Sequence, residues 1–204
     1  MTSTPSAPVR SKRFDGVRIL LALVAVMWVS EIVDTAADHR LDQYGIEPRD
    51  ADGLIGVFTA PFLHLGFGHL ISNTVPFIAM GLAIALAGAV RVIGVTAVVA
   101  AVSGVGTWLT APDGSVTIGA SGIVFGYATY LISRGLFTRG VVDLVVGLLV
   151  IVFWGGALLG GLLPEQGISW QGHLFGAIGG IVAARLLARG ASDPAPSAPA
   201  LPAS

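Results

Sequence analysis

The sequence predicts an all-α, polytopic membrane protein with six transmembrane helices. Three observations carry this prediction. Hydrophobic residues make up 54% of the 204 residues and charged residues only 11%, whereas soluble domains average about 25% charged residues. The mean hydropathy of the whole chain is +0.83. Several uncharged stretches also reach the roughly 20 apolar residues that a helix needs to cross a bilayer.

Six segments fit a membrane-spanning helix in length and composition. The first, residues 19–37, is apolar until Glu31 and Asp34 near its far end. Four others carry no charged residue, and the last contains only His173 as an ionisable group. These five segments are residues 70–90, 92–111, 116–133, 144–163 and 168–184. The first segment also resembles a cleavable secretory signal, but the other five would still hold the chain in the membrane.

The positions of lysine and arginine predict that both termini are cytoplasmic. With the N-terminus inside, all of the 11 basic residues except Arg40 and Arg49 fall in cytoplasmic segments. We therefore expect a multi-pass protein of the cell membrane, in which the segment after the first span faces outward.

The chain divides into three predicted parts. Residues 1–16 form a cytoplasmic N-terminal tail, residues 17–188 form the six-helix domain, and residues 189–204 form a disordered Pro/Ala-rich tail. Residues 38–68 are predicted to be a loop in the outer interface, because glycine and proline interrupt their apolar half. The net charge of −1 and the absence of cysteine exclude a basic nucleic-acid surface, disulfides and thiolate chemistry.

Four polar residues lie toward the outer ends of the predicted helices: His69, Asn73, Ser121 and His173. His69 and Asn73 are four residues apart and therefore share one helix face. Each residue has a structural explanation when taken alone, because a serine commonly bonds its own helix backbone and an asparagine commonly joins helices. Their common depth favours one shared site, since polar groups inside a membrane are costly.

Small-residue stripes predict which helices meet at this site. Such stripes let helix backbones approach closely. The glycines at four-residue spacing are Gly122 and Gly126 on the fourth predicted span, and Gly172, Gly176 and Gly180 on the sixth. Close approach of these two spans places Ser121 within hydrogen-bonding reach of His173. A serine paired with a histidine is the arrangement of an activated nucleophile.

The start of the fourth span predicts a site for a developing oxyanion. Gly119 permits a sharp turn, and the first backbone N–H groups of a helix have no intrahelical acceptor. We therefore expect the amides of Gly119, Ala120 and Ser121, with the side chains of His69 and Asn73, to offer hydrogen-bond donors.

Other chemistries lack their motifs. The second glycine of a G-x-S-x-G elbow is missing, and no phosphate-binding loop or H-E-x-x-H is present. His64 and His69 are five residues apart and do not share a helix face, so we expect no metal site there and no cofactor.

These residues resemble a rhomboid intramembrane serine protease. The resemblance rests on "HLGFGHLISN", "GASG" and "GHLFGAIGG" in this order, and it covers about residues 17–188. It implies a Ser121–His173 catalytic dyad, and an oxyanion hole made by the Ser121 amide with His69 and Asn73. It also implies that His64 shapes the first loop, that no cofactor is needed, and that the substrates are transmembrane proteins cut in or next to a membrane helix.

Two departures from the family pattern stand out. Ile55 and Gly56 occupy the place of a common Trp-Arg pair in the first loop, and Phe125 stands where a tyrosine often packs against the catalytic histidine. Two alternatives remain open. One is a non-catalytic rhomboid-like protein that binds membrane clients, and the other is a small transporter or channel. A transporter needs a polar path across the whole membrane, whereas the polar residues here gather at one end.

Overall fold

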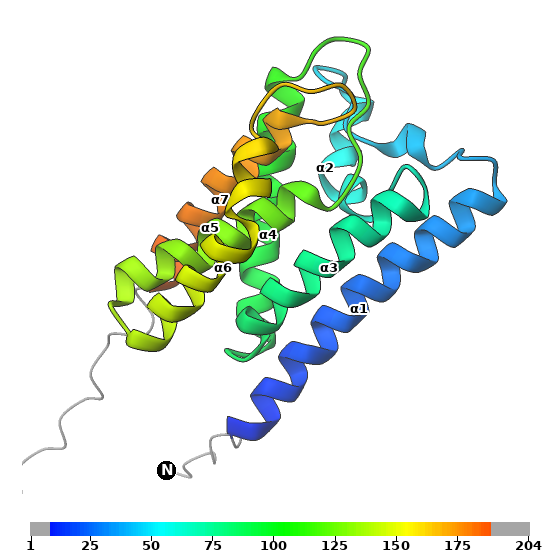
Figure 1. Ribbon diagram of the computed structural model, residues 1–204. Coiled ribbons are helices and arrows are strands. Elements are labelled where there is room, and N and C mark those ends of the chain that lie inside the picture. The colour runs from blue at the N-terminus through cyan, green and yellow to red at the C-terminus, as the bar shows by residue number, and fades with distance from the viewer. Residues whose placement is uncertain (1–8, 189–204) are drawn as a thin grey trace, which may run out of the picture.

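The computed structural model describes residues 9–188, which form seven α-helices and three short 3-10 helices without a β-strand. The predicted tail over residues 189–204 and the first half of the predicted N-terminal tail, residues 1–8, lie outside this part of the chain. The helices are α1 (Val9–Ala36), α2 (Gly56–Thr59), α3 (Gly66–Ala85), α4 (Ala89–Thr110), α5 (Ser121–Thr138), α6 (Val141–Gly160) and α7 (Trp170–Ala188). The six long helices lie side by side along one direction (Figure 1).

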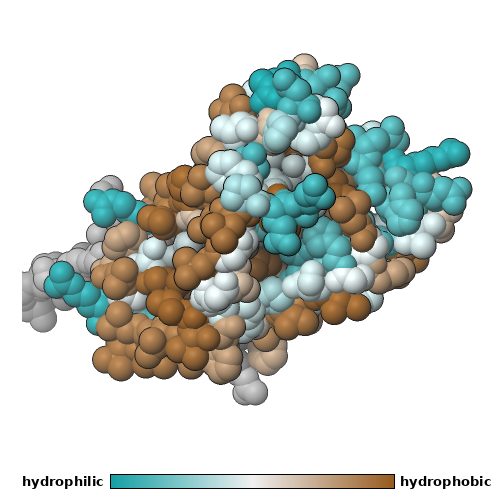
Figure 2. Space-filling view, turned by 45° about the horizontal axis from the view of Figure 1, so that its top comes forward, coloured by the Kyte–Doolittle hydropathy of each residue, from teal (hydrophilic) through white to brown (hydrophobic). Residues whose placement is uncertain are grey.

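Four helices are long and apolar enough to cross a membrane: α1 from Lys12, α3, α4 and α6. Their outward side chains are largely hydrophobic, and large apolar residues are exposed along α1 and α6. Figure 2 shows these hydrophobic side chains covering the flanks, while hydrophilic ones gather toward the ends of the molecule. Helices α5 and α7 are not among these four, and they make extensive contact with each other.

Several helix boundaries differ from those predicted, and three of the differences bear on the fold. Helix α1 begins at Val9, ahead of the predicted start at residue 19. Its first turns therefore include the basic residues that precede the apolar segment. The predicted span over residues 70–90 instead ends as α3 at Ala85, and Gly88 with φ +103° turns the chain into α4. Helix α5 begins only at Ser121, because Thr117 is extended and pairs with Ile46 of the first loop.

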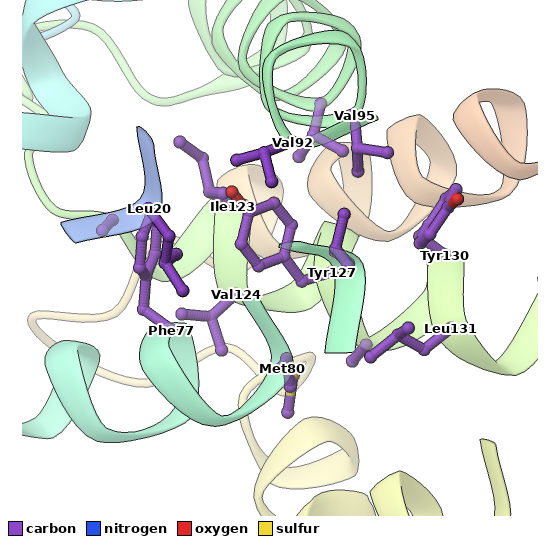
Figure 3. Packing of buried hydrophobic residues seen from close by; sticks show 14 of the residues in the cluster. Leu20, Phe77, Met80, Val92, Val95, Ile123, Val124, Tyr127, Tyr130 and Leu131 are labelled. Atoms are coloured by element: carbon purple, nitrogen blue, oxygen red, sulfur yellow. The ribbon is translucent and has the colours of Figure 1, made fainter. Parts of the chain in front are cut away.

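Helix α5 lies at the centre of the bundle, packed against α3, α4, α6 and α7. Tyr127 on α5 is fully buried and its ring lies 5.1 Å from that of Phe77 on α3 (Figure 3). Its hydroxyl shares a 2.6 Å hydrogen bond with Thr96 on α4. In a bilayer, dispersion contacts and interhelical hydrogen bonds such as these stabilise helix association, because lipid is as apolar as the side chains.

Glycine allows α5 and α7 to touch backbone to backbone. A Cβ on Gly176 would collide with the carbonyl oxygen of Gly122, and a Cβ on Gly180 with that of Gly126. No larger residue fits at these positions without separating the two helices. The glycine stripes thus set the position of α7 beside the start of α5.

The first loop forms short helical turns instead of a span. They are η1 (Asp42–Tyr44), η2 (Asp52–Ile55), α2 and η3 (Ala60–Phe62). Ile55 and Gly56 are the two residues that replace the common Trp-Arg pair of the family. Ile55 is exposed, and Gly56 lets the backbone of Gly45 pack closely, because a Cβ at position 56 would collide with it. The loop also bonds the segment before α5, since Gly119 N–H donates to the carbonyl of Ala60 over 2.8 Å.

Candidate active site

Ser121 and His173 meet where α5 and α7 begin. Ser121 is the first residue of α5, and His173 lies in the first turn of α7. Ser121 Oγ lies 2.9 Å from His173 Nε2, which is hydrogen-bonding distance. The histidine is buried, with 7% of its surface exposed. The structure therefore brings together the serine and the histidine that the sequence analysis paired.

The other ring nitrogen of His173 determines where the proton sits. Nδ1 lies 2.7 Å from the backbone carbonyl oxygen of Gly161, and a carbonyl can only accept a hydrogen bond. Nδ1 therefore carries the proton of the neutral ring, and Nε2 presents its lone pair to Ser121. Phe125 stacks on the imidazole with ring centroids 4.1 Å apart and planes inclined by 6°. One hydrogen bond and one flat aromatic contact hold the ring.

Gly161 is a residue that the sequence analysis missed. It caps the C-terminal end of α6, and a Cβ there would lie 2.6 Å from Phe125 Cζ and 3.0 Å from His173 Nδ1. Any side chain at this position would crowd the two rings. The sequence offers no distinctive signal, because Gly161 is one of 28 glycines and stands outside the small-residue stripes.

His69 and Asn73 stand one turn apart on α3, next to the segment that enters α5. Leu65 N–H donates to His69 Nδ1 over 3.2 Å, so the proton of the neutral His69 ring sits on Nε2. Asn73 Nδ2 uses one hydrogen in a 3.1 Å bond to the His69 carbonyl, which leaves its second hydrogen for another acceptor. A Cβ on Gly119 would lie 3.0 Å from His69 Nε2 and 3.8 Å from Asn73 Nδ2. Both donors therefore lie beside the turn that precedes Ser121.

The backbone amides before α5 differ in their partners. Gly119 N–H donates to the Ala60 carbonyl over 2.8 Å, and Ala120 N–H donates to His64 Nε2 over 3.4 Å. Both groups donate to acceptors within the protein, and the expectation that Gly119 and Ala120 supply amides to an oxyanion stays a prediction. Ser121 begins the helix, so its own N–H has no intrahelical acceptor.

His64 lies behind His69 and is fully buried. The two rings meet edge to face with centroids 5.1 Å apart. Burial, followed by the charge repulsion that a protonated His69 would exert, lowers the pKa of His64 to about 4. His64 is therefore neutral near pH 7, and it supports the His69 ring and the turn into α5.

A cleft of about 740 Å³ contains His69, Asn73, Ser121 and His173 on its walls. Its rim includes residues 115–118 before α5 and residues 164–169 before α7. A second, smaller cavity of about 30 Å³ adjoins Ser121 and is lined by Ser103 and Thr107 of α4. That volume holds one or two waters, and within the described residues the buried Thr107 hydroxyl has no protein partner.

Comparison with known proteins places the chain in a family. The family model of the rhomboid domain matches residues 51–190. The chain belongs to the rhomboid family. It is 42% identical over 194 residues to the uncharacterized protein Rv1337 of Mycobacterium tuberculosis, an alignment covering 91% of this chain and 81% of the relative. An uncharacterized Mycobacterium leprae protein, ML1171, is 42% identical over 177 residues, covering 82% and 70% of the two chains.

A more distant rhomboid relative carries a functional name. The Bacillus subtilis protein named "Putative rhomboid protease YdcA" is 28% identical over 176 residues, which cover 81% of this chain and 85% of that protein. Family membership, together with the four apolar helices, identifies a multi-pass membrane protein. The resemblance seen in the sequence is thereby confirmed at the level of the rhomboid family.

Proposed function

We propose that this rhomboid is an intramembrane serine endopeptidase that hydrolyses peptide bonds in or next to transmembrane segments of other membrane proteins. The observation that carries the proposal is the Ser121–His173 pair. Nε2 of His173 faces Ser121 Oγ at 2.9 Å with its lone pair, because the ring proton stays on Nδ1, which donates a hydrogen bond to the Gly161 carbonyl. A base of this kind is what a serine needs to become a nucleophile.

The proposed reaction proceeds through an acyl-enzyme. Ser121 Oγ attacks the scissile carbonyl carbon while His173 Nε2 takes the hydroxyl proton. The resulting oxyanion accepts hydrogen bonds from the Ser121 amide and from the His69 and Asn73 side chains. His173 then returns the proton to the leaving amine, and the peptide bond breaks.

Hydrolysis of the acyl-enzyme completes the cycle. His173 Nε2 removes a proton from water, whose oxygen attacks the ester carbonyl, and the proton then returns to Ser121 Oγ as the acid product leaves. The cavity lined by Ser103 and Thr107 supplies a place for water beside Ser121. No acidic third member is proposed, since the Gly161 carbonyl orients the base. No metal or cofactor takes part in these steps.

The proposal includes a topology. All six long helices span the cell membrane, with α5 and α7 inside the bundle, both termini cytoplasmic and the cleft toward the outer face. We further expect substrates whose helices contain small or helix-weakening residues near the cut, since a scissile carbonyl must first lose its helical hydrogen bond. The chain contains no cysteine, so the single substitutions Arg40→Cys and Arg139→Cys each introduce one thiol. A membrane-impermeant thiol reagent added outside should label the protein with Arg40→Cys and not the protein with Arg139→Cys.

Labelling with a fluorophosphonate probe tests the chemistry directly. Purified protein in detergent and in lipid is compared with Ser121→Ala and His173→Ala, and with Ser72→Ala as a matched control. Ser72 also lines the cleft, but its hydroxyl bonds the His69 carbonyl. We expect labelling of the wild type and the control, and loss of labelling in the two dyad variants. A folded wild type without labelling in either medium would instead favour the non-catalytic, client-binding function.

A further inference from the structure

A cluster of ionisable side chains lies where α1 meets the first loop, away from the Ser121–His173 pair. Glu31 and Asp34 belong to the last turns of α1, and His39 and Asp42 follow in the loop. Glu31 and Asp34 are 0% and 1% exposed. Two carboxylates buried so completely require compensation for the water that they have lost.

No basic residue supplies that compensation within the described part of the chain. The arginines there that form ion pairs do so with Asp15, Asp113 and Asp143. His39 is the one imidazole in the cluster, and its Nδ1 lies 3.1 Å from Asp34 Oδ2. One imidazole cannot balance three acids in their ionised forms.

The geometry of the cluster suits a bound cation. Asp34, His39 and Asp42 each offer one ligand atom, and these three atoms lie within 4.8 Å of one another. Ligands about 2.0–2.2 Å from one metal ion lie at most about 4.4 Å apart, so the three groups are close enough to meet on one ion after a small movement. Asp38 and His39 adopt left-handed φ angles of 53° and 59°, which turn the loop back so that His39 and Asp42 face α1. Leu41 N–H also donates to Asp34 Oδ1 over 2.6 Å and holds this turn in place.

Two unpartnered oxygens provide an independent sign of a missing ligand. Glu31 Oε2 and Asp42 Oδ1 are buried, and neither has a hydrogen-bond partner among the described residues. Glu31 precedes Asp34 by three residues on the same helix face, and its carboxylate interacts electrostatically with Asp34, His39 and Asp42. A buried polar atom without a partner is rare in folded proteins, and an unfilled ion site is one of its explanations.

We propose that Asp34, His39 and Asp42 bind a divalent transition-metal cation, whose two positive charges balance the two aspartates, with Glu31 as a neighbouring carboxylate. The mixed ligand set favours Zn²⁺ over Mg²⁺ and Ca²⁺, because imidazole suits Zn²⁺ whereas Mg²⁺ and Ca²⁺ prefer oxygen alone, and the two carboxylates also suit Mn²⁺. The ion joins the end of α1 to the start of the first loop. It is a structural site, and it takes no part in the proposed proteolysis.

Mn²⁺ is the probe of choice because its binding is followed directly by electron paramagnetic resonance. The full chain in detergent is treated with EDTA, transferred to chelator-free buffer and titrated with Mn²⁺, then with Zn²⁺ as competitor. The ligand variants are Asp42→Asn and His39→Gly, the latter chosen because glycine accepts the left-handed φ. Asp38→Asn is the matched control, since it removes one negative charge from the same loop outside the ligand set.

The expected result is one Mn²⁺ per chain, displaced by Zn²⁺, with affinity reduced at least tenfold in each ligand variant and unchanged in the control. Mn²⁺ should also raise the melting temperature of the wild type, and melting curves without metal establish that the variants fold. Folded wild type that shows no saturable binding of Mn²⁺ or Zn²⁺ would overturn the proposal. So would binding that both ligand variants retain in full.

Discussion

The replacement Gly161→Ala tests whether the backbone carbonyl at the end of α6 orients the proposed base. Its φ of −69° and ψ of −8° suit alanine, so the substitution introduces no backbone strain. The new Cβ would lie 2.6 Å from Phe125 Cζ and 3.0 Å from His173 Nδ1, whereas ordinary contacts begin at 3.4 Å. The rings or the end of α6 must therefore move by about 1 Å, and a misplacement of this size costs on the order of a hundredfold in rate.

We expect Gly161→Ala to lower kcat/KM for a transmembrane substrate and the rate of fluorophosphonate labelling by ten- to a hundredfold. Gly160→Ala is the control, because it lies next in sequence and a Cβ there meets no atom within 4 Å. Substrate binding away from the dyad should change little, so the loss should appear in kcat more than in KM. Equal rates for Gly161→Ala and Gly160→Ala, in proteins of equal melting temperature, would refute the reasoning.

Three further substitutions follow from the same contacts. Gly119→Ala should abolish most fluorophosphonate labelling, because its φ is +117° and the new Cβ would lie 2.7 Å from the His69 ring. Gly114→Ala controls for backbone strain alone, because its φ is +71° and no atom lies near its Cβ. Equal labelling of the two variants would contradict this account. Gly180→Ala should destabilise the bundle by about 1–3 kcal/mol, because the Cβ at position 180 would collide with the Gly126 carbonyl. Thermal unfolding in detergent measures this loss, with Gly156→Ala as the control because a Cβ there meets no atom within 4 Å. His64→Gln should remove a pH dependence of stability. The folded-state pKa of His64 is lowered from 6.5 to about 4, so its contribution is complete above pH 6.5 and is lost as pH falls toward 4. At about 1.4 kcal/mol per pKa unit, the free energy of unfolding of the wild type should fall by about 3 kcal/mol between pH 6.5 and pH 4 relative to that of His64→Gln. Parallel curves of unfolding free energy against pH for the two proteins would contradict this prediction.

Much of the bundle follows from local features of the sequence. Apolar length predicts α1, α3, α4 and α6, and these helices are found close to the predicted segments. The stripe at Gly176 and Gly180 predicts a close partner for α7, because a residue without a side chain matters only where another backbone approaches. The boundaries were harder to predict. The sequence between residues 116 and 120 is apolar enough to continue a helix, and bonds to the distant first loop, such as the pairing of Thr117 with Ile46, hold it out of the helix.

The side chains of the candidate site and the pairing of Ser121 with His173 were predictable from the sequence. The hydrogen bonds that orient these side chains were not. Ser121, His69, Asn73 and His173 attract attention because polar groups are costly at membrane depth. The partners that orient them are backbone atoms, which the sequence does not distinguish.

The cluster around Asp34 was missed for a different reason. Glu31 and Asp34 lie near a predicted helix end, where exposed acids are common, and only the left-handed turn at His39 shows that the loop folds back and buries them.

The acceptor that orients His173 is a peptide carbonyl, and that has a consequence for natural variation. Every amino acid that can stand at position 161 carries the same carbonyl, so no codon change can delete this hydrogen bond. What the codon controls is the room left for two rings. A mutational scan of side chains would therefore record position 161 as a size limit, and the atom that directs the imidazole would leave no trace of its own in the scan.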